Sequence, residues 1–162
     1  MKFCPETNPI IEGHEPVASN AVAATCDPVY LGNATGVWII CHEDYASDTT
    51  KATMTLREGA TSAVALAGTY AVTETWGGWK NITAQTSDAI TALTAAATFE
   101  MDGETGGNNC IWMFYFPASK LTDGRDWLHP TFAAGDSSNL MSVMYILDGF
   151  RYKQDAPPTA VA

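Results

Sequence analysis

A run of seven consecutive apolar residues at positions 110–116, Cys-Ile-Trp-Met-Phe-Tyr-Phe, constrains the fold of this chain more than any other feature. The run is far too short for a membrane helix, which needs roughly 20 apolar residues. Its aromatic content favours a β-strand, and Pro117 ends it. A strand that is apolar on both faces is a central strand, covered by both sheets or by a sheet and a partner.

Further short strands are predicted on both sides of this run. Residues 37–41 are β-branched and aromatic, and residues 52–58 alternate between apolar and polar side chains, as in a half-buried strand. Three more strands are predicted, at residues 70–75, 98–101 and 140–152. About six to eight short strands separated by Gly-rich turns predict an all-β fold: a single antiparallel β-sandwich or jelly-roll-like domain.

Other segments are predicted to lie outside the strands. The sequence Trp76-Gly77-Gly78-Trp79 is typical of a tight, hairpin-like corner. Residues 87–94 are predicted to hold one helical turn, capped by Ser87 or Asp88. His129 precedes Pro130 and is interpreted as a loop residue.

The two ends are predicted to be assembly arms. Residues 1–28 contain four prolines and form an extended N-terminal arm, residues 29–152 form the sandwich, and residues 153–162 form a tail with polyproline character. Neither end buries enough apolar area to offset the backbone entropy lost on ordering, roughly 1–2 kcal/mol per residue. We therefore expect both ends to become ordered on a partner.

Alternation along the predicted strands also predicts the core and the state of the cysteines. The expected core residues are Trp38, Ile40, Met54, Leu56, Trp112, Phe114, Val143, Tyr145 and Leu147. The four cysteines include no C-x-x-C pair, which argues against zinc and thioredoxin-type sites. Free thiols are expected, with Cys41 and Cys110 buried, and a disulfide formed outside the lysed cell is the alternative.

Charge restricts the classes of partner. The formal net charge is −10 and the sequence pI is about 4.4. Nucleic-acid binding needs a basic footprint, and docking on anionic lipid needs one too, so neither partner is expected. The N-terminus shows no apolar stretch typical of an export signal, and the chain is expected to fold in a cytoplasm.

No set of residues converges on catalysis, cofactor binding or metal binding, and we expect a protein that is not an enzyme. The trio His42-Glu43-Asp44 is interpreted as a solvated strand end, because adjacent residues of an extended chain point to opposite faces. Asp102-Gly103-Glu104 is interpreted as a hairpin tip rather than a calcium site. Asp123 and Asp126 are expected to form a local salt bridge with Arg125.

The aromatic residues allow a second interpretation, a sugar-binding platform. Its candidate members are Trp76, Trp79, Trp112, Trp127 and Tyr115. Filling of the sandwich core is the favoured interpretation, because the strand pattern directs several of these rings inward. The sugar-binding module stays open as an alternative.

Several segments resemble small virion proteins of tailed bacteriophages. Residues 142–160 are similar to the C-terminal ends of such proteins, which are encoded near the major capsid gene. Residues 37–41, residues 52–59 and the Leu121-Thr122-Asp123-Gly124 turn fit the same pattern. The resemblance extends over roughly residues 15–160.

The resemblance implies a non-enzymatic structural role on the virion. The commonest role in this class is capsid decoration, in which a cement protein binds the outer surface of the major capsid protein lattice and neighbouring copies of itself as a homo-oligomer. Such a protein is assembled in the bacterial host cytoplasm and ends on the capsid surface. The N-terminal Cys4-Pro5 segment departs from the pattern and leaves a collar, connector or tail position as an alternative.

Overall fold

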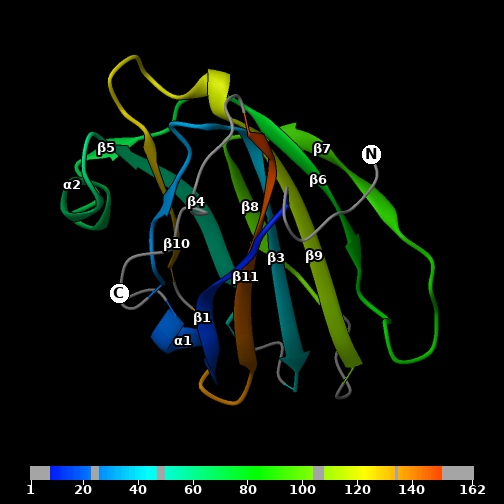
Figure 1. Cartoon of the computed structure of the whole chain (residues 1–162). Helices are drawn as coiled ribbons and strands as arrows, with labels where there is room; N and C mark the ends of the chain where they lie inside the picture. Colours follow the sequence, from blue (N-terminus) through cyan, green and yellow to red (C-terminus); the bar gives the residue numbers. More distant parts are fainter. Residues whose placement is uncertain (1–7, 23–25, 47–49, 104–107, 134, 151–162) are drawn as a thin grey trace.

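Two antiparallel sheets pack face to face in the computed structural model, which describes residues 8–22, 26–46, 50–103, 108–133 and 135–150 (Figure 1). The six strands of the first sheet follow the order β1 (Ile10–Ala18), β11 (Leu140–Phe150), β3 (Ala34–Tyr45), β9 (Asn108–Pro117), β6 (Trp76–Asn81) and β7 (Thr91–Ala96). The second sheet contains β2 (Val29–Tyr30), β10 (Trp127–Ala133), β4 (Ala52–Gly59) and β5 (Tyr70–Ala71), with β8 (Thr98–Met101) also paired to β4. The predicted all-β sandwich is confirmed.

Among the described residues, helical structure is confined to short pieces, α1 (Ser19–Val22), α2 (Ser62–Leu66) and the 3₁₀ turn η1 (Ala118–Lys120). Thr61 caps α2, since its hydroxyl accepts a hydrogen bond from the Val64 backbone N–H at 3.3 Å. α2 packs against β4 and β10 of the second sheet (Figure 1). In the described part of the chain, none of the helices has the length and apolar character needed to cross a membrane.

The core lies between the two sheets and is rich in aromatic rings. Trp76 packs edge-on against Phe99 and Phe114, with ring centroids 4.5 Å and 5.0 Å apart. Seven of the predicted core residues are buried there: Met54, Leu56, Trp112, Phe114, Val143, Tyr145 and Leu147. Cys41 and Cys110 are buried, as expected, and so is Cys26.

The predicted orientation of β3 is wrong. Val37, Ile39 and Cys41 are buried between the sheets, whereas Trp38 and Ile40 point outward and are only partly buried. Both alternating sets of β3 are apolar, so the period-2 pattern by itself cannot tell which set faces the core. Pairing with β11 decides it, because Ile39 lies opposite the buried Tyr145.

Part of the predicted N-terminal arm belongs to the sheet. β1 pairs with β11 along most of its length, so the prediction of an irregular arm over residues 1–28 is wrong for this strand. Pro16 is tolerated because β1 is an edge strand and its register shifts between His14 and Val17. The predicted C-terminal tail and residues 1–7 lie outside the described residues.

Three predicted non-strand segments are also strands. The Trp76–Trp79 corner is part of β6, and the predicted helical turn at 87–94 runs into β7. His129 and Pro130 lie in β10, where Pro130 pairs with Leu56 of β4. β2 pairs with β10 only at Trp127 and Leu128, so Pro130 needs no hydrogen-bond donor on that side.

Candidate functional site: the outer apolar face of the first sheet

The first sheet presents large apolar side chains on the face that points away from the second sheet. Side chains alternate across a strand, so the residues between the buried ones point outward. The strand register aligns these outward residues in two rows across the sheet. One row contains Ile10, Ile146, Trp38 and Tyr115, and the other contains Met144, Ile40, Met113 and Trp79. We call these eight residues the outer apolar face.

The outer apolar face is accessible to solvent. Ile10 is 59% exposed, Met144 is 39% exposed and Trp79 is 36% exposed, and the remaining members are partly exposed. Soluble monomers rarely expose apolar patches larger than a few hundred Å², and larger patches mark interaction sites. The apolar character of both faces of β9, noted in the sequence, therefore has two origins: one face lies in the core, and the other is open to solvent.

Three aromatic rings of the outer apolar face pack against one another. The Trp38 ring centroid lies 5.0 Å from that of Tyr115 and 5.6 Å from that of Trp79, in tilted arrangements. Such pairs contribute about 0.5–1.5 kcal/mol beyond their buried area. β3, β9 and β6 each supply one ring, so the cluster exists only when these strands pair in the observed register.

A hollow of about 270 Å³ opens beside this cluster, where β6 passes β7. It is lined by Gly77, Gly78, Trp79, Ala92, Leu93 and Tyr115, and none of these side chains is charged. A Cβ atom on Gly77 would meet nothing within 4 Å, so the missing side chain leaves open space in the surface. We call this hollow the Gly77 groove.

A hydrogen bond fixes the orientation of Tyr115. Its hydroxyl donates to the Asp148 carboxylate at 2.9 Å. Burial, and then the hydrogen bond and charge of Asp148, raise the pKa of Tyr115 to about 12. The phenol therefore stays neutral at physiological pH, and one side of the Gly77 groove keeps a fixed shape.

The outer face of the second sheet is different, because it carries polar side chains and is partly covered. Thr55 and Thr131 lie opposite each other on β4 and β10, with their hydroxyl oxygens 2.6 Å apart. α2 packs against the same strands, and the Nδ1 atom of His129 lies 3.2 Å from the Ala65 carbonyl oxygen. The two outward faces of the sandwich therefore differ in chemistry, and the first sheet has the apolar one.

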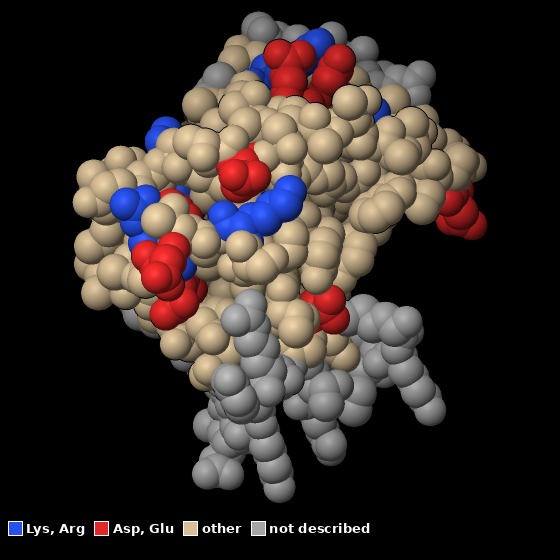
Figure 2. All heavy atoms as spheres, turned by 90° about the horizontal axis from the view of Figure 1, so that it is seen from above, with Lys and Arg blue, Asp and Glu red and all other residues tan. Residues whose placement is uncertain are grey.

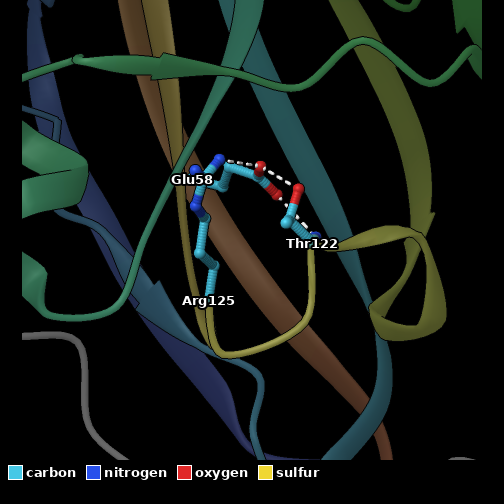
Figure 3. A network of polar contacts seen from close by, with 3 residues as sticks. All are labelled: Glu58, Thr122 and Arg125. Atoms are coloured by element: carbon cyan, nitrogen blue, oxygen red, sulfur yellow. Dashed lines mark hydrogen bonds and ion pairs between the residues drawn. The ribbon is translucent and has the colours of Figure 1, made fainter.

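A polar network closes one end of the sandwich around Glu58 (Figure 3). The backbone N–H of Thr122 donates to Oε2 of Glu58 at 2.9 Å, and the Thr122 hydroxyl donates to Oε1 at 2.5 Å. Arg125 donates from Nη1 to the same Oε1 at 2.6 Å, and its guanidinium lies 3.7 Å from the centroid of the Tyr70 ring. The predicted local salt bridge of Arg125 with Asp123 and Asp126 is replaced by this contact across 67 positions of the chain.

The geometry of this network gives Glu58 a structural role rather than the role of a general base. We call its contacts with Thr122 and Arg125 the Glu58 brace. Burial raises the pKa of Glu58, but the hydrogen bonds from Thr122 and the charge of Arg125 outweigh burial and lower it. A carboxylate that is already saturated with donors is a poor proton acceptor. The network lines a polar cleft of about 480 Å³ and joins the 118–126 segment to β4.

Seen from above, charged side chains of both signs occur in small groups separated by uncharged surface (Figure 2).

The His42-Glu43-Asp44 trio divides between the two faces of β3. His42 and Asp44 are exposed, as expected for a solvated strand end, but Glu43 is only 1% exposed. Asn139 donates from Nδ2 to Oε1 of Glu43 at 3.4 Å. Burial raises the pKa of Glu43 to about 7, and hydrogen bonds from Asn139 and Ser19 reduce that rise. Within the described ranges, no three His, Cys, Asp or Glu side chains are grouped so that they could hold a metal ion.

The predicted sugar-binding platform is only partly brought together. Trp76 and Trp112 are buried in the core, and Trp127 packs against Tyr30 on the second sheet, with ring centroids 5.2 Å apart. Trp79 and Tyr115 share one surface. Sequence analysis missed the third ring of that surface, Trp38, and the signal that could have identified it is the apolar character of both faces of residues 37–41.

No protein-family model, curated protein or solved structure matches this chain. The candidate site therefore rests on the geometry described above.

Proposed function

We propose that this chain is a non-enzymatic structural component of a tailed-bacteriophage virion, a decoration protein that binds the outer surface of the major capsid protein lattice. The observation that carries the proposal is the outer apolar face, a broad surface of large side chains on one sheet. A cement protein needs such a flat contact surface on a rigid domain, whereas a small-molecule enzyme needs an enclosed pocket. The resemblance of residues 142–160 to phage virion proteins supplies the identity of the partner.

Repetition strengthens such a contact. Copies of a decoration protein occupy a lattice, so each copy binds beside others, and weak contacts add through avidity. The net charge of −10 makes copies repel each other, and a contact surface of mostly apolar side chains limits the electrostatic cost of close packing on the head. The proposal therefore predicts that apolar contacts, rather than ion pairs, dominate attachment.

Cosedimentation with heads of the encoding phage tests the proposal. Wild-type chain should sediment with heads that lack it, and the Ile40→Ser/Met144→Ser variant should remain largely in the supernatant. Ile40 and Met144 lie opposite each other on β3 and β11, so the pair removes one continuous part of the outer apolar face. Leu66→Ser, on α2 of the second sheet, changes another exposed apolar residue and should bind as wild type.

Other outcomes identify the alternatives. Sedimentation with isolated tails or connectors but not with heads would assign a collar, connector or tail position. Failure of the wild-type chain to bind any virion part would refute the virion assignment.

A sugar-binding module is the second candidate, because Trp38, Trp79 and Tyr115 cluster on one surface. Binding on a glycan array that Trp79→Ala abolishes would support that candidate instead.

A further inference from the structure

We propose that the Gly77 groove binds the Pro157-Pro158 segment of a neighbouring copy of this chain. The groove and the segment are both features of the chain itself, so the inference goes beyond the virion assignment and does not rest on it. It joins a described surface to a sequence motif that lies outside the described residues, the polyproline character of residues 153–162.

The chemistry of the groove suits proline. Grooves that recognise polyproline II segments are lined by aromatic rings, and the proline rings pack against them. Trp79 and Tyr115 both line the Gly77 groove, and its volume of about 270 Å³ is free of charged side chains. The missing side chain of Gly77 provides depth, since no atom lies within 4 Å of the position that its Cβ would take.

Contacts within the chain also hold the aromatic rings of the groove in place. Trp38 packs against both Trp79 and Tyr115, at centroid distances of 5.6 Å and 5.0 Å. The hydrogen bond to Asp148 holds the Tyr115 ring from its other end. Because a preformed site loses little conformational entropy on binding, even a short segment can bind to it.

The sequence of the tail is complementary to the groove. Residues 156–162 carry no charged side chain, and the segment Ala156-Pro157-Pro158-Thr159 has two consecutive prolines. Consecutive prolines favour the polyproline II conformation in advance, which lowers the entropic cost of binding. Copies with a net charge of −10 repel each other, so an uncharged segment in an uncharged groove is a favourable way for two copies to touch.

Chain length favours a neighbouring copy over the same copy. β11 ends opposite Ala34, and the groove lies three strands away on β6, about 14 Å across the sheet. Trp38 pairs with Ile146, so the groove also lies about 13 Å back along β11, and the direct distance is about 19 Å. Pro157 follows Phe150 by seven residues, which reach about 22 Å in polyproline II form. That length leaves almost nothing for the reversal of direction that binding to the same copy requires.

Complementation between two defective full-length variants tests the proposal by sedimentation velocity. Gly77→Val puts a branched side chain into the groove at a position where a Cβ atom meets nothing within 4 Å, and Pro157→Ala/Pro158→Ala alters the segment. Wild type should associate as its concentration rises, and each variant alone should associate about tenfold more weakly or worse, as after loss of an aromatic or proline anchor. An equimolar mixture should form dimers, because the segment of the first variant meets the open groove of the second.

Controls and contrary outcomes are defined on the same measurement. Leu66→Ala, on the other side of the sandwich, should associate as wild type, and thermal melts should show that every variant is folded. The proposal is wrong if wild type stays monomeric over the concentration series, if both variants associate as wild type does, or if the mixture forms no dimers. Because no phage particle is present, these outcomes are independent of the virion assignment.

Discussion

Trp38 packs against Trp79 on the outer face of the first sheet, with ring centroids 5.6 Å apart, although the two residues come from strands that are not neighbours. β9 separates β3 from β6, and the two indoles meet over its Met113 and Tyr115 side. An aromatic cluster on the outside of a sheet, rather than between the sheets, is the feature that connects the fold to the proposed function. β3 therefore has one apolar face in the core and one on the outside of the sheet, and the effects of substitutions on the two faces can be compared directly.

Adjacent isoleucines on β3 provide the first prediction. Ile39 is fully buried, so Ile39→Ala should lower the free energy of unfolding by about 2–5 kcal/mol. Ile40 lies on the outer apolar face, and Ile40→Ala should cost about 1 kcal/mol, since only part of its surface is lost from contact. Urea unfolding of the two variants measures the difference. Equal losses would contradict the orientation of β3.

How far the sequence predicts the fold depends on whether a strand has one polar face. β4 alternates Met54 and Leu56 with threonines, so its inward face was predicted correctly. β3 and β9 are apolar on both faces, and only their pairing determines which side chains are buried. The outer apolar face could not be predicted for the same reason, because it depends on the register of several strands.

Two glycines within a strand and one contact between residues far apart in sequence explain the remaining differences between the predicted and the observed structure. Gly77 and Gly78 suggest a turn in the sequence, yet β6 continues through them. Glycine is needed at position 78, because a Cβ atom there would clash with the Met113 carbonyl oxygen. Glycine in a strand can mark close approach of another backbone rather than a turn. Arg125 was assigned to its nearest carboxylates, whereas the fold brings it to Glu58, which is far away in sequence.

Removal of the Arg125 cation provides the second prediction. Arg125→Ala leaves the Glu58 carboxylate, with a side chain only 4% exposed, without its cation, and should cost about 1–3 kcal/mol in thermal or urea unfolding. Lys120→Ala removes a cation of the same cleft whose ammonium group donates to the Thr75 backbone carbonyl, and should cost less than about 0.5 kcal/mol. Equal costs for the two variants would argue against the brace.

The stability that the Glu58 network contributes should depend on pH, which is the third prediction. The pKa of Glu58 is lower in the folded chain than its usual value of 4.5, so its ionised form stabilises the fold above that pH. This contribution should disappear as the pH falls below about 4.5 and through the folded pKa. Arg125→Ala should weaken the acid-side decline of stability, measured as melting temperature against pH. A decline unchanged by the substitution would assign acid sensitivity to other carboxyl groups.

Deletion of residues 157–162 is the fourth prediction. If the Pro157-Pro158 segment serves contacts between copies, the melting temperature of dilute, monomeric chain should be nearly unchanged without it. At high concentration, where wild type associates, the deletion should lower the melting temperature relative to wild type. Scanning calorimetry at both concentrations measures the two effects. Unfolding of the dilute, truncated chain would show that the segment belongs to the core.

The fifth prediction concerns the buried carboxyl of Glu43. Its pKa is about 7 in the folded chain, against 4.5 for an ordinary glutamate, so between these pH values the folded state holds a proton that the unfolded state releases. Stability from this group is therefore complete below about pH 4.5 and is lost as the pH rises through 7. At about 1.4 kcal/mol per pH unit, the loss amounts to roughly 3 kcal/mol.

Glu43→Gln separates this effect from all others on the strand. A glutamine keeps the size of the side chain and a hydrogen-bonding oxygen near Asn139, but it does not titrate, so the decline in stability that Glu43 causes between about pH 4.5 and 7 should disappear. The opposite contribution of His129, whose pKa is lowered by burial, should remain. Asp44→Asn removes an exposed carboxylate from the next position and should leave the wild-type profile unchanged. Urea unfolding at a series of pH values distinguishes the two. If Glu43→Gln retains the wild-type decline, then Glu43 is ionised in the folded chain and its burial is tolerated by solvation from its neighbours.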